Sequence, residues 1–263
     1  MRVNRTRRFY NGCLLTEAHR DCVEVVLVSP RNPLNVGAAA RAMANFGFAR
    51  LTVVAPFEAH WREAKSAVGA PELLRNAQEC ATLAEALAHC TLVVGTGTRT
   101  RRKAEQPAIL LPVLVPWVVE ELARGGRVAL VFGPEKHGLT RDDLSHCHLL
   151  VEIPTDARQP SMNLGQAVAV CLYELARSRP RDAESAQPGA VSPPADSGTL
   201  DRLADVIEEA MSASGYAPPT MQQANRHDLR VMLRRLAWLE NDARRALGLF
   251  RRILWRLRHP GSG

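Results

Sequence analysis

Short β-branched runs alternate with helix-like stretches along the first two thirds of the chain, and this alternation restricts the fold more than any other feature. Strands that alternate with helices are typical of a parallel sheet that is covered on both faces. The pattern therefore predicts an α/β fold with a mainly parallel sheet. The expected strands cover Val23 to Val28, Leu51 to Ala55, Thr91 to Gly95, Val128 to Phe132 and Leu149 to Ile153.

Two helices of this domain are predicted from their spacing, because apolar residues recur on one face of each. Both helices directly follow polar loops, and the α/β domain is expected to span residues 23 to 178. The first apolar face comprises Val36, Ala39, Met43 and Phe46, and the second comprises Leu164, Val168, Leu172 and Leu175.

The segments on either side of this domain differ from it in composition. Residues 1 to 22 contain five arginines and little periodicity, which predicts a basic flexible extension. Residues 179 to 198 are rich in Pro, Ser and Ala and are expected to form a linker. Residues 199 to 263 show helical patterns only and predict a small helical unit. Its apolar stripes are Leu229, Leu233, Leu236 and Leu239, and Leu247, Phe250, Leu254 and Leu257.

The chain is strongly basic, with a net charge of +7, and 31 of its 34 basic residues are arginine. Between Arg226 and Arg258 ten arginines accompany three acids, and several recur at heptad spacing opposite an apolar stripe. Planar guanidinium groups suit bidentate phosphate contacts, so this face predicts a polyanionic partner. A solvated or helix-binding face is the alternative, and a GC-rich genome would also raise the arginine content.

The cysteine pattern and the longest apolar stretch exclude several classes of protein. Six cysteines form no C-x-x-C pair and no metal-ligand spacing with histidine, so neither a disulfide framework nor a metal site is expected. The stretch from Ala108 to Val119 is interrupted by Pro112 and Pro116 and is too short to span a bilayer. We expect a soluble protein of the cytoplasm.

Four loops follow predicted strands, at the edge where open α/β sheets bind ligands. The first, residues 29 to 37, places Asn35 near the start of a helix, where free backbone N–H groups favour an anion. Arg41 follows six residues later and can border the same strand end. The sequence pattern fits two interpretations of Arg41 equally well, a surface ion pair and a functional role.

The second and third loops contain glycines. Residues 95 to 103 combine small residues with four positive charges, which suits contact with both a cofactor and RNA, but a lone G-x-G is not a dinucleotide fingerprint. Residues 133 to 139 begin like a phosphate-binding P-loop, yet Leu139-Thr140 replaces the Lys-Ser or Lys-Thr pair that an NTPase requires. Glu135 is interpreted as a turn-stabilising or ligand-orienting carboxylate.

The fourth loop runs from Ile153 to the start of a long helix. It places the hydroxyl of Ser161 and the amide of Asn163 where the helix begins. Capping of the helix is the default interpretation of Ser161.

Three of these segments, in this order, resemble motifs of the SPOUT class of RNA methyltransferases. They are N-P-x-N-x-G-x-x-A-R at Asn32 to Arg41, L-V-F-G-P-E-x-x-G-L at Leu130 to Leu139, and I-P with S-M-N-L-x-Q-A-V within Ile153 to Val168. Within the class they are similar to the TrmJ type, which methylates the ribose 2′-hydroxyl of cytidine or uridine at position 32 of the tRNA anticodon loop. The resemblance extends from Val23 to about Arg177.

This resemblance implies a trefoil knot in the C-terminal part of the sheet domain, although knots are otherwise nearly absent from proteins. It also implies a homodimer with a shared active site and S-adenosyl-L-methionine as cofactor. Gln159-Pro160 departs from the family pattern just before Ser161. The residues implied in cofactor binding are Thr96, Gly97, Thr98, Gly133, Ile153, Ser161, Met162 and Asn163.

The family pattern also implies residues for catalysis, whereas most candidates for RNA binding come from the basic loop at residues 95 to 103 and from the basic face of the helical unit. The catalytic candidates are Arg41, Asn35, Ser161, Glu135 and Asn163. The candidates for RNA binding are Arg41, Arg99, Arg101 and Arg102, together with Arg244 and Arg251 of the helical unit. Arginine stays protonated and is a poor general base, so we expect Arg41 to hold a phosphate or to stabilise a developing alkoxide.

Three functions other than tRNA methylation are alternatives for this sequence. A 2′-O-methyltransferase of the same class that acts on ribosomal RNA is the nearest. A non-catalytic RNA-binding protein on the same fold would bind RNA with steep salt dependence and would not bind the cofactor. A dinucleotide-dependent oxidoreductase is the most distant, because no acidic residue follows a complete glycine fingerprint at the required distance.

Overall fold

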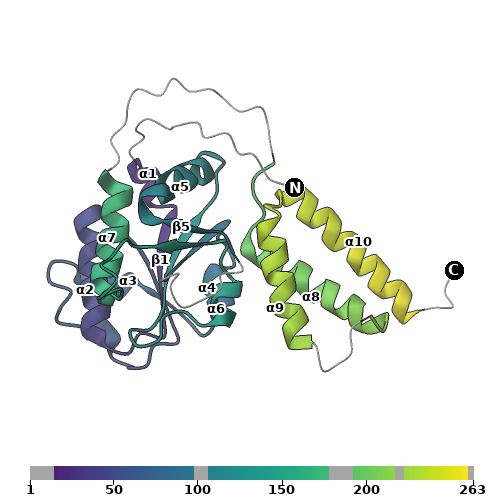
Figure 1. Cartoon of the computed structure of the whole chain (residues 1–263), viewed down its shortest axis with the longest axis horizontal. Helices are drawn as coiled ribbons and strands as arrows, with labels where there is room; N and C mark the ends of the chain where they lie inside the picture. Colours follow the sequence, from purple (N-terminus) through teal and green to yellow (C-terminus); the bar gives the residue numbers. More distant parts are fainter. Residues whose placement is uncertain (1–14, 98–105, 178–191, 217–221, 260–263) are drawn as a thin grey trace, which may run out of the picture.

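The computed structural model describes residues 15–97, 106–177, 192–216 and 222–259. A central sheet carries helices on both faces, and three further helices lie beside it, to the right in Figure 1. None of the helices in these ranges is long and apolar enough to cross a membrane.

The sheet has seven strands in the order β3-β2-β1-β6-β4-β7-β5, and every neighbouring pair is parallel. The prediction of a mainly parallel sheet is therefore confirmed, and each of the five expected strands is present to within one residue at either end. The strands are β1 (Val23–Val28), β2 (Arg50–Val54), β3 (Gln78–Cys80), β4 (Leu92–Thr96), β5 (Ala108–Leu110), β6 (Val128–Phe132) and β7 (Leu149–Glu152).

Sequence patterns missed β3 and β5, the two strands at the edges of the sheet. Each has only three residues, and β3 reads Gln-Glu-Cys, which lacks the apolar side chains of a buried strand. β5 begins the apolar stretch from Ala108, which continues through a short 3-10 helix into α5 (Leu114–Ala123). Edge strands this short are formed by pairing with a neighbour, so local sequence does not reveal them.

Helices cover the two faces of the sheet unequally. The larger apolar cluster joins one face to α2 (Pro33–Phe46), α5 and α7 (Leu164–Arg177), and the smaller joins the other face mainly to α4 (Leu83–Leu87). The apolar faces predicted for α2 and α7 pack into the first cluster. The remaining short helices of this domain are α1 (Glu17–Arg20), α3 (Pro71–Asn76), α6 (Arg141–Ser145) and the 3-10 helix Trp61–Glu63.

The N-terminal segment is shorter as an extension than the sequence indicated. Leu15 is only 1% exposed and belongs to the larger core cluster, and Thr16 caps α1. Residues 15 to 22 are therefore part of the fold, contrary to expectation, because a single apolar side chain and a capped turn leave no periodic pattern. Residues 1 to 14 lie outside the described part of the chain.

The C-terminal residues form α8 (Ser197–Ala213), α9 (Gln222–Arg235) and α10 (Glu240–Arg258). Their own small core contains Leu203, Leu229, Leu233 and Leu247. The expected linker, residues 179 to 198, ends earlier than predicted, because α8 already begins at Ser197, and linker residues 179 to 191 lie outside the described ranges.

The apolar stripe predicted from Leu229 to Leu239 is wrong in its second half. Because α9 ends at Arg235, Leu236 falls outside the helix and is 58% exposed, while Leu239 is the N-cap residue of α10. On α10 the predicted stripe holds for Leu247 and Leu254, but Leu257 is exposed.

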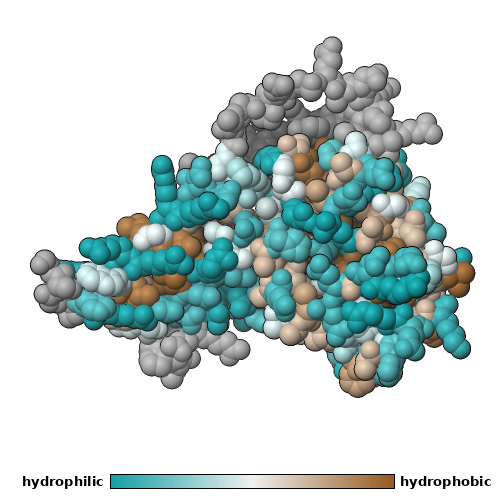
Figure 2. Space-filling view, turned by 180° about the vertical axis from the view of Figure 1, so that it is seen from behind, coloured by the Kyte–Doolittle hydropathy of each residue, from teal (hydrophilic) through white to brown (hydrophobic). Residues whose placement is uncertain are grey.

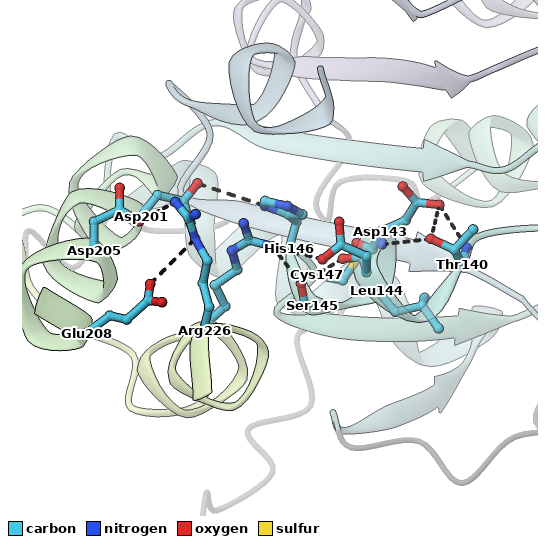
Figure 3. A network of polar contacts seen from close by, with 12 residues as sticks. Thr140, Asp143, Leu144, Ser145, His146, Cys147, Asp201, Asp205, Glu208 and Arg226 are labelled. Carbon is cyan, nitrogen blue, oxygen red and sulfur yellow. Dashed lines mark hydrogen bonds and ion pairs between the residues drawn. The ribbon is translucent and has the colours of Figure 1, made fainter. Parts of the chain in front are cut away.

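The helical unit contacts the sheet domain at the end of α6. The Arg234 side chain of α9 is completely buried and donates to the carbonyl of His146 at 3.0 Å and to Asp201 of α8 at 2.8 Å. Figure 3 shows His146 facing Asp201, and Arg226 directed at acidic residues of α8. Burial, with the nearby charge of Arg234, lowers the pKa of His146 to about 3, so its ring is neutral at physiological pH. Arg234 therefore ties α6, α8 and α9 together.

Candidate active site

Four loops meet at the carboxyl edge of the sheet because β1, β6, β4 and β7 are consecutive strands in it. The loops after β6 and β7 carry Glu135, Ser161 and Asn163, whereas Asn35 lies in the first turn of α2, the helix after β1, and Arg41 lies farther along that helix. Ligands bind at this edge in open α/β sheets. The order of the strands thus brings together residues that are more than 100 positions apart.

Glu135 forms the centre of a polar network between the loops that follow β1 and β6. Its carboxylate accepts hydrogen bonds from the backbone N–H groups of Arg31 at 3.1 Å and Asn32 at 3.2 Å, and from the Asn35 side chain at 2.8 Å. Burial would raise the pKa of Glu135, but the Asn35 side chain and these backbone donors outweigh it and hold the pKa below its usual range. Glu135 is therefore ionised at neutral pH and serves to orient Asn35.

Asn163 extends this network to the loop after β7. Its side-chain nitrogen donates to the Asn35 oxygen at 2.9 Å, and its own oxygen accepts from the backbone of Gly165 at 2.9 Å. Asn163 thus caps α7, and the capping interpretation of Ser161 is wrong. The side-chain oxygen that can reach the first N–H groups of α7 is two residues closer to the helix than the sequence indicated. Ser161 itself is exposed.

The anion expected at the start of α2 is a group of this chain. The N–H groups of Arg31 and Asn32 bind the Glu135 carboxylate, and the Leu34 N–H donates to the Asn32 side chain at 2.9 Å. The expectation that backbone N–H groups at this point favour an anion is therefore met by the Glu135 carboxylate. The structure uses them to fix Asn35, whose side chain is oriented by both of its neighbours.

Glycines let the loop after β6 close tightly. A Cβ atom on Gly133 would lie 2.3 Å from the carbonyl carbon of Gly138 and 2.3 Å from the nitrogen of Leu139. Gly138 has a φ of 63°, a conformation that favours glycine. The backbone of residues 133 to 139 therefore folds back on itself, and this brings Glu135 toward the loop after β1.

The residues implied in cofactor binding lie at the ends of the adjacent strands β6, β4 and β7. Thr96 donates its hydroxyl hydrogen bond to the carbonyl of Val131 at 3.0 Å, and the Gly97 N–H donates to Val151 at 3.1 Å. A Cβ on Gly97 would meet no atom of the described residues within 4 Å, so none of them fills the space beside this backbone. Ile153 is partly buried, as is Met162, which directly precedes Asn163, while Thr98 lies outside the described residues. These loops are compatible with a ligand that is held mainly by backbone groups.

The predicted RNA-binding arginines are not gathered at this network. Arg41 is exposed on α2 and makes no hydrogen bond or ion pair with any residue that the structure describes. Arg244 and Arg251 are exposed on α10, where Arg244 pairs with Glu240 one turn earlier. The other three, Arg99, Arg101 and Arg102, lie outside the described ranges.

Glu24, His89 and Cys90 form a second polar cluster, away from the loops described above. Their possible ligand atoms lie within 4.8 Å of one another. Sequence spacing missed the cluster because Glu24 lies on β1 and the other two residues follow α4. The Glu24 oxygens accept from Thr52 and lie 2.7 Å from His89 Nε2, and burial raises the pKa of the Cys90 thiol far above its ordinary value. These bonds give the cluster a structural role in joining β1, β2 and α4.

A parallel α/β sheet with a polar network and glycine-bounded loops at its carboxyl edge defines an enzyme class that binds nucleotide-like ligands there. Residues 23–173 match the model of the SpoU rRNA Methylase family. The chain is 35% identical over 253 residues to the tRNA (cytidine/uridine-2′-O-)-methyltransferase TrmJ of Klebsiella pneumoniae, covering 92% of this chain and 98% of that protein. The chain therefore belongs to the SpoU methylase family.

Two further comparisons agree with this assignment. The chain is 42% identical over 161 residues to the tRNA (cytidine/uridine/adenosine-2′-O-)-methyltransferase TrmJ of Pseudomonas aeruginosa, and the match covers 59% of this chain and 60% of that protein. The crystal structure of TrmJ from Z. mobilis superposes with a TM-score of 0.76 at 29% identity, covering 88% of this chain and 98% of that one. The chain is an RNA methyltransferase, and its cofactor is S-adenosylmethionine.

Proposed function

We propose that the protein methylates the ribose 2′-hydroxyl of cytidine or uridine at position 32 in the tRNA anticodon loop. The observation that carries this proposal is the match to the Klebsiella tRNA methyltransferase over 98% of its length. The Asn35–Glu135–Asn163 network supports it, because it holds a polar side chain rigidly at the ligand-binding edge.

Methyl transfer to a hydroxyl requires a fixed geometry, since the attacking oxygen must lie in line with the bond that breaks. S-adenosylmethionine supplies a methyl carbon that its sulfonium sulfur makes electrophilic. In the proposal the backbone at Thr96, Gly97, Gly133 and Ile153 holds it, with Thr98, Ser161, Met162 and Asn163 completing the site. Asn35 orients the ribose hydroxyl, and Glu135 and Asn163 orient Asn35.

Arg41 is proposed to stabilise the negative charge that develops on the ribose oxygen, or to hold the adjoining phosphate. A protonated guanidinium is a poor base but a strong partner for an anion. Its side chain is exposed and unpaired among the described residues, so it is available for such a partner. Ser161 is also exposed, and in the proposal it takes part in the same methyl transfer.

The remaining proposals concern assembly and substrate binding. Arg41 is exposed and makes no hydrogen bond or ion pair with the Asn35 network among the described residues, which supports a homodimer whose site takes residues from both subunits. We also propose that the loops after β6 and β7 form the trefoil knot and that the protein works in the cytoplasm.

The two parts of the chain have different roles in this proposal: residues 23 to 178 carry catalysis, and residues 199 to 263 bind tRNA. The tRNA contacts proposed are Arg41, Arg99, Arg101, Arg102, Arg244 and Arg251.

Mapping of 2′-O-methylation on tRNA incubated with the pure protein and labelled S-adenosylmethionine tests this function. We expect the label in the anticodon loop at position 32. Labelling of ribosomal RNA alone would establish the alternative substrate, which the name of the family favours. Arg41→Lys tests the electrostatic role, because lysine keeps the charge and loses the planar fork. Nearly full methylation by this variant would refute the specific role of the guanidinium.

A further inference from the structure

Phe57 is an exposed aromatic side chain beside the Glu135 network. Its ring is 70% exposed, and the guanidinium carbon of Arg31 lies 5.6 Å from the ring centroid. A cation over an aromatic face is weakly favourable in water, and Phe57 stays largely exposed although Arg31 lies over its ring. The pair therefore presents a flat surface with a positive charge at its side.

The backbone that carries this pair is held in an unusual conformation. Ser29 and Ala55, at the ends of β1 and β2, have positive φ angles of 44° and 43°. Only one other non-glycine residue among those described has a positive φ angle. Such conformations cost about 1 kcal/mol or more and are concentrated at functional sites. Hydrogen bonds from the Ser29 N–H to Val54 at 2.8 Å and from the Phe57 N–H to Pro30 at 3.2 Å hold the two loops together.

Arg31 connects this surface directly to the proposed catalytic network. Its backbone N–H donates to the same Glu135 carboxylate that accepts from Asn35. The backbone of Arg31 is thus held by the same carboxylate that orients the Asn35 side chain. Phe57 and Asn35 are thus linked through Arg31 and the Glu135 carboxylate.

We propose that Phe57 and Arg31 form a stacking platform for an unpaired base of the RNA substrate. Unpaired bases in RNA loops are commonly bound by stacking on aromatic rings and on arginine guanidinium planes. An exposed ring fixed at the ligand-binding edge, with a cation beside it, provides both groups. The platform rests on the proposed function, and it positions the loop nucleotides so that one ribose reaches Asn35. Stacking tolerates different bases, so the platform contributes affinity and position and not base identity.

The test uses the full-length protein with an anticodon stem-loop RNA that carries 2-aminopurine in its loop. Phe57→Leu removes the ring and keeps an apolar side chain, whereas Phe57→Tyr keeps the ring. Val68→Ala is the matched control, because Val68 is also an exposed apolar residue, at 62%, in the segment between β2 and β3. We expect Phe57→Leu to raise KM for the RNA about tenfold with little change in kcat. The tyrosine and Val68 variants should behave as the wild type.

A second readout is independent of catalysis. Stacking on Phe57 should quench 2-aminopurine fluorescence when the wild-type protein binds, and Phe57→Leu should lose that quenching while calorimetry shows unchanged binding of S-adenosylmethionine. Equal KM and equal quenching for the wild type and Phe57→Leu would overturn the platform. A change from dimer to monomer in Phe57→Leu alone would also overturn it, since the ring would then belong to a protein interface. Absence of tRNA methylation by the wild type would instead refute the proposed function, and the fluorescence would still decide the platform.

Discussion

The side-chain amide of Asn35 donates to the Glu135 carboxylate at 2.8 Å, although 100 positions separate the two residues. The Asn35 oxygen in turn accepts from Asn163, so one amide is held from both sides by two other loops. An amide fixed in this way cannot flip, and its free surface is presented in one orientation.

Glu135→Gln should lower the rate of methylation by about 10- to 100-fold, because a misplaced orienting group costs that much in reactions that depend on alignment. The glutamine amide cannot accept from all three donors at once. Steady-state kinetics should show the loss mainly in kcat, with calorimetry showing S-adenosylmethionine still bound. If the effect of Asn35→Ala and that of Glu135→Gln simply add in the double variant, the two residues do not act through each other.

Gly133→Ala should destabilise the protein by ~3 kcal/mol or prevent folding, because its Cβ would overlap the backbone of Gly138 and Leu139. Gly97→Ala is the contrasting variant, since a Cβ there meets no atom of the described chain within 4 Å. It should unfold at the same urea concentration as the wild type and yet bind S-adenosylmethionine more weakly. Unchanged affinity of Gly97→Ala would remove Gly97 from the cofactor site.

Arg234→Met should lower the free energy of unfolding by ~3 kcal/mol, as the loss of one partner from a buried ion pair generally does. The change leaves Asp201 and the carbonyl of His146 without their donor. Arg235→Met is the control, because the neighbouring side chain is exposed. Urea denaturation should separate the two variants. Equal stabilities would show that the helical unit is not anchored through Arg234.

Acid should destabilise the fold through Glu24. Burial would raise the pKa of Glu24, but hydrogen bonds from His89 and Thr52 outweigh it and place the pKa below its ordinary value of 4.5. A carboxyl group whose pKa is lowered on folding stabilises the protein above its unfolded pKa, and that stability is lost as the pH falls through the folded value. Urea midpoints of the wild type should therefore fall below about pH 4.5.

Glu24→Gln provides the control for this acid sensitivity. It should be less stable than the wild type at pH 7, and the difference should shrink as the pH is lowered. A constant difference between the two proteins from pH 7 to pH 4 would show that ionised Glu24 adds no stability.

Arg251→Gln should weaken tRNA binding and reduce the slope of log K against log salt by about one, the change expected for one lost phosphate contact. Arg75→Gln on α3 is the control, because that arginine is also exposed but pairs with Glu72. Filter binding at several salt concentrations measures both slopes. The RNA-binding role of α10 fails if the two slopes are equal.

Much of the fold follows from local patterns. The strands from Val23 to Val28 and from Val128 to Phe132 have the predicted limits, because a buried parallel strand needs a continuous apolar run bounded by turn residues. The helix faces of α2 and α7 were predictable for a similar reason, since burial on one side imposes helical spacing. The family resemblance grouped Asn35, Glu135 and Asn163 with Arg41 and Ser161, and the structure joins the first three by hydrogen bonds.

Tertiary structure alone decided what those residues do to one another. The anion expected at the backbone donors before α2 is the Glu135 carboxylate of the same chain, and Asn163 replaces Ser161 as the cap of α7. Arg234 is buried although Arg235, the next residue, is exposed, because the Arg234 side chain donates to the carbonyl of His146 at the end of α6. The spacing of apolar residues along a chain indicates which side of a helix or strand is buried. Hydrogen bonds between loops depend on the order of strands in the sheet, and that order is set by packing across the whole domain.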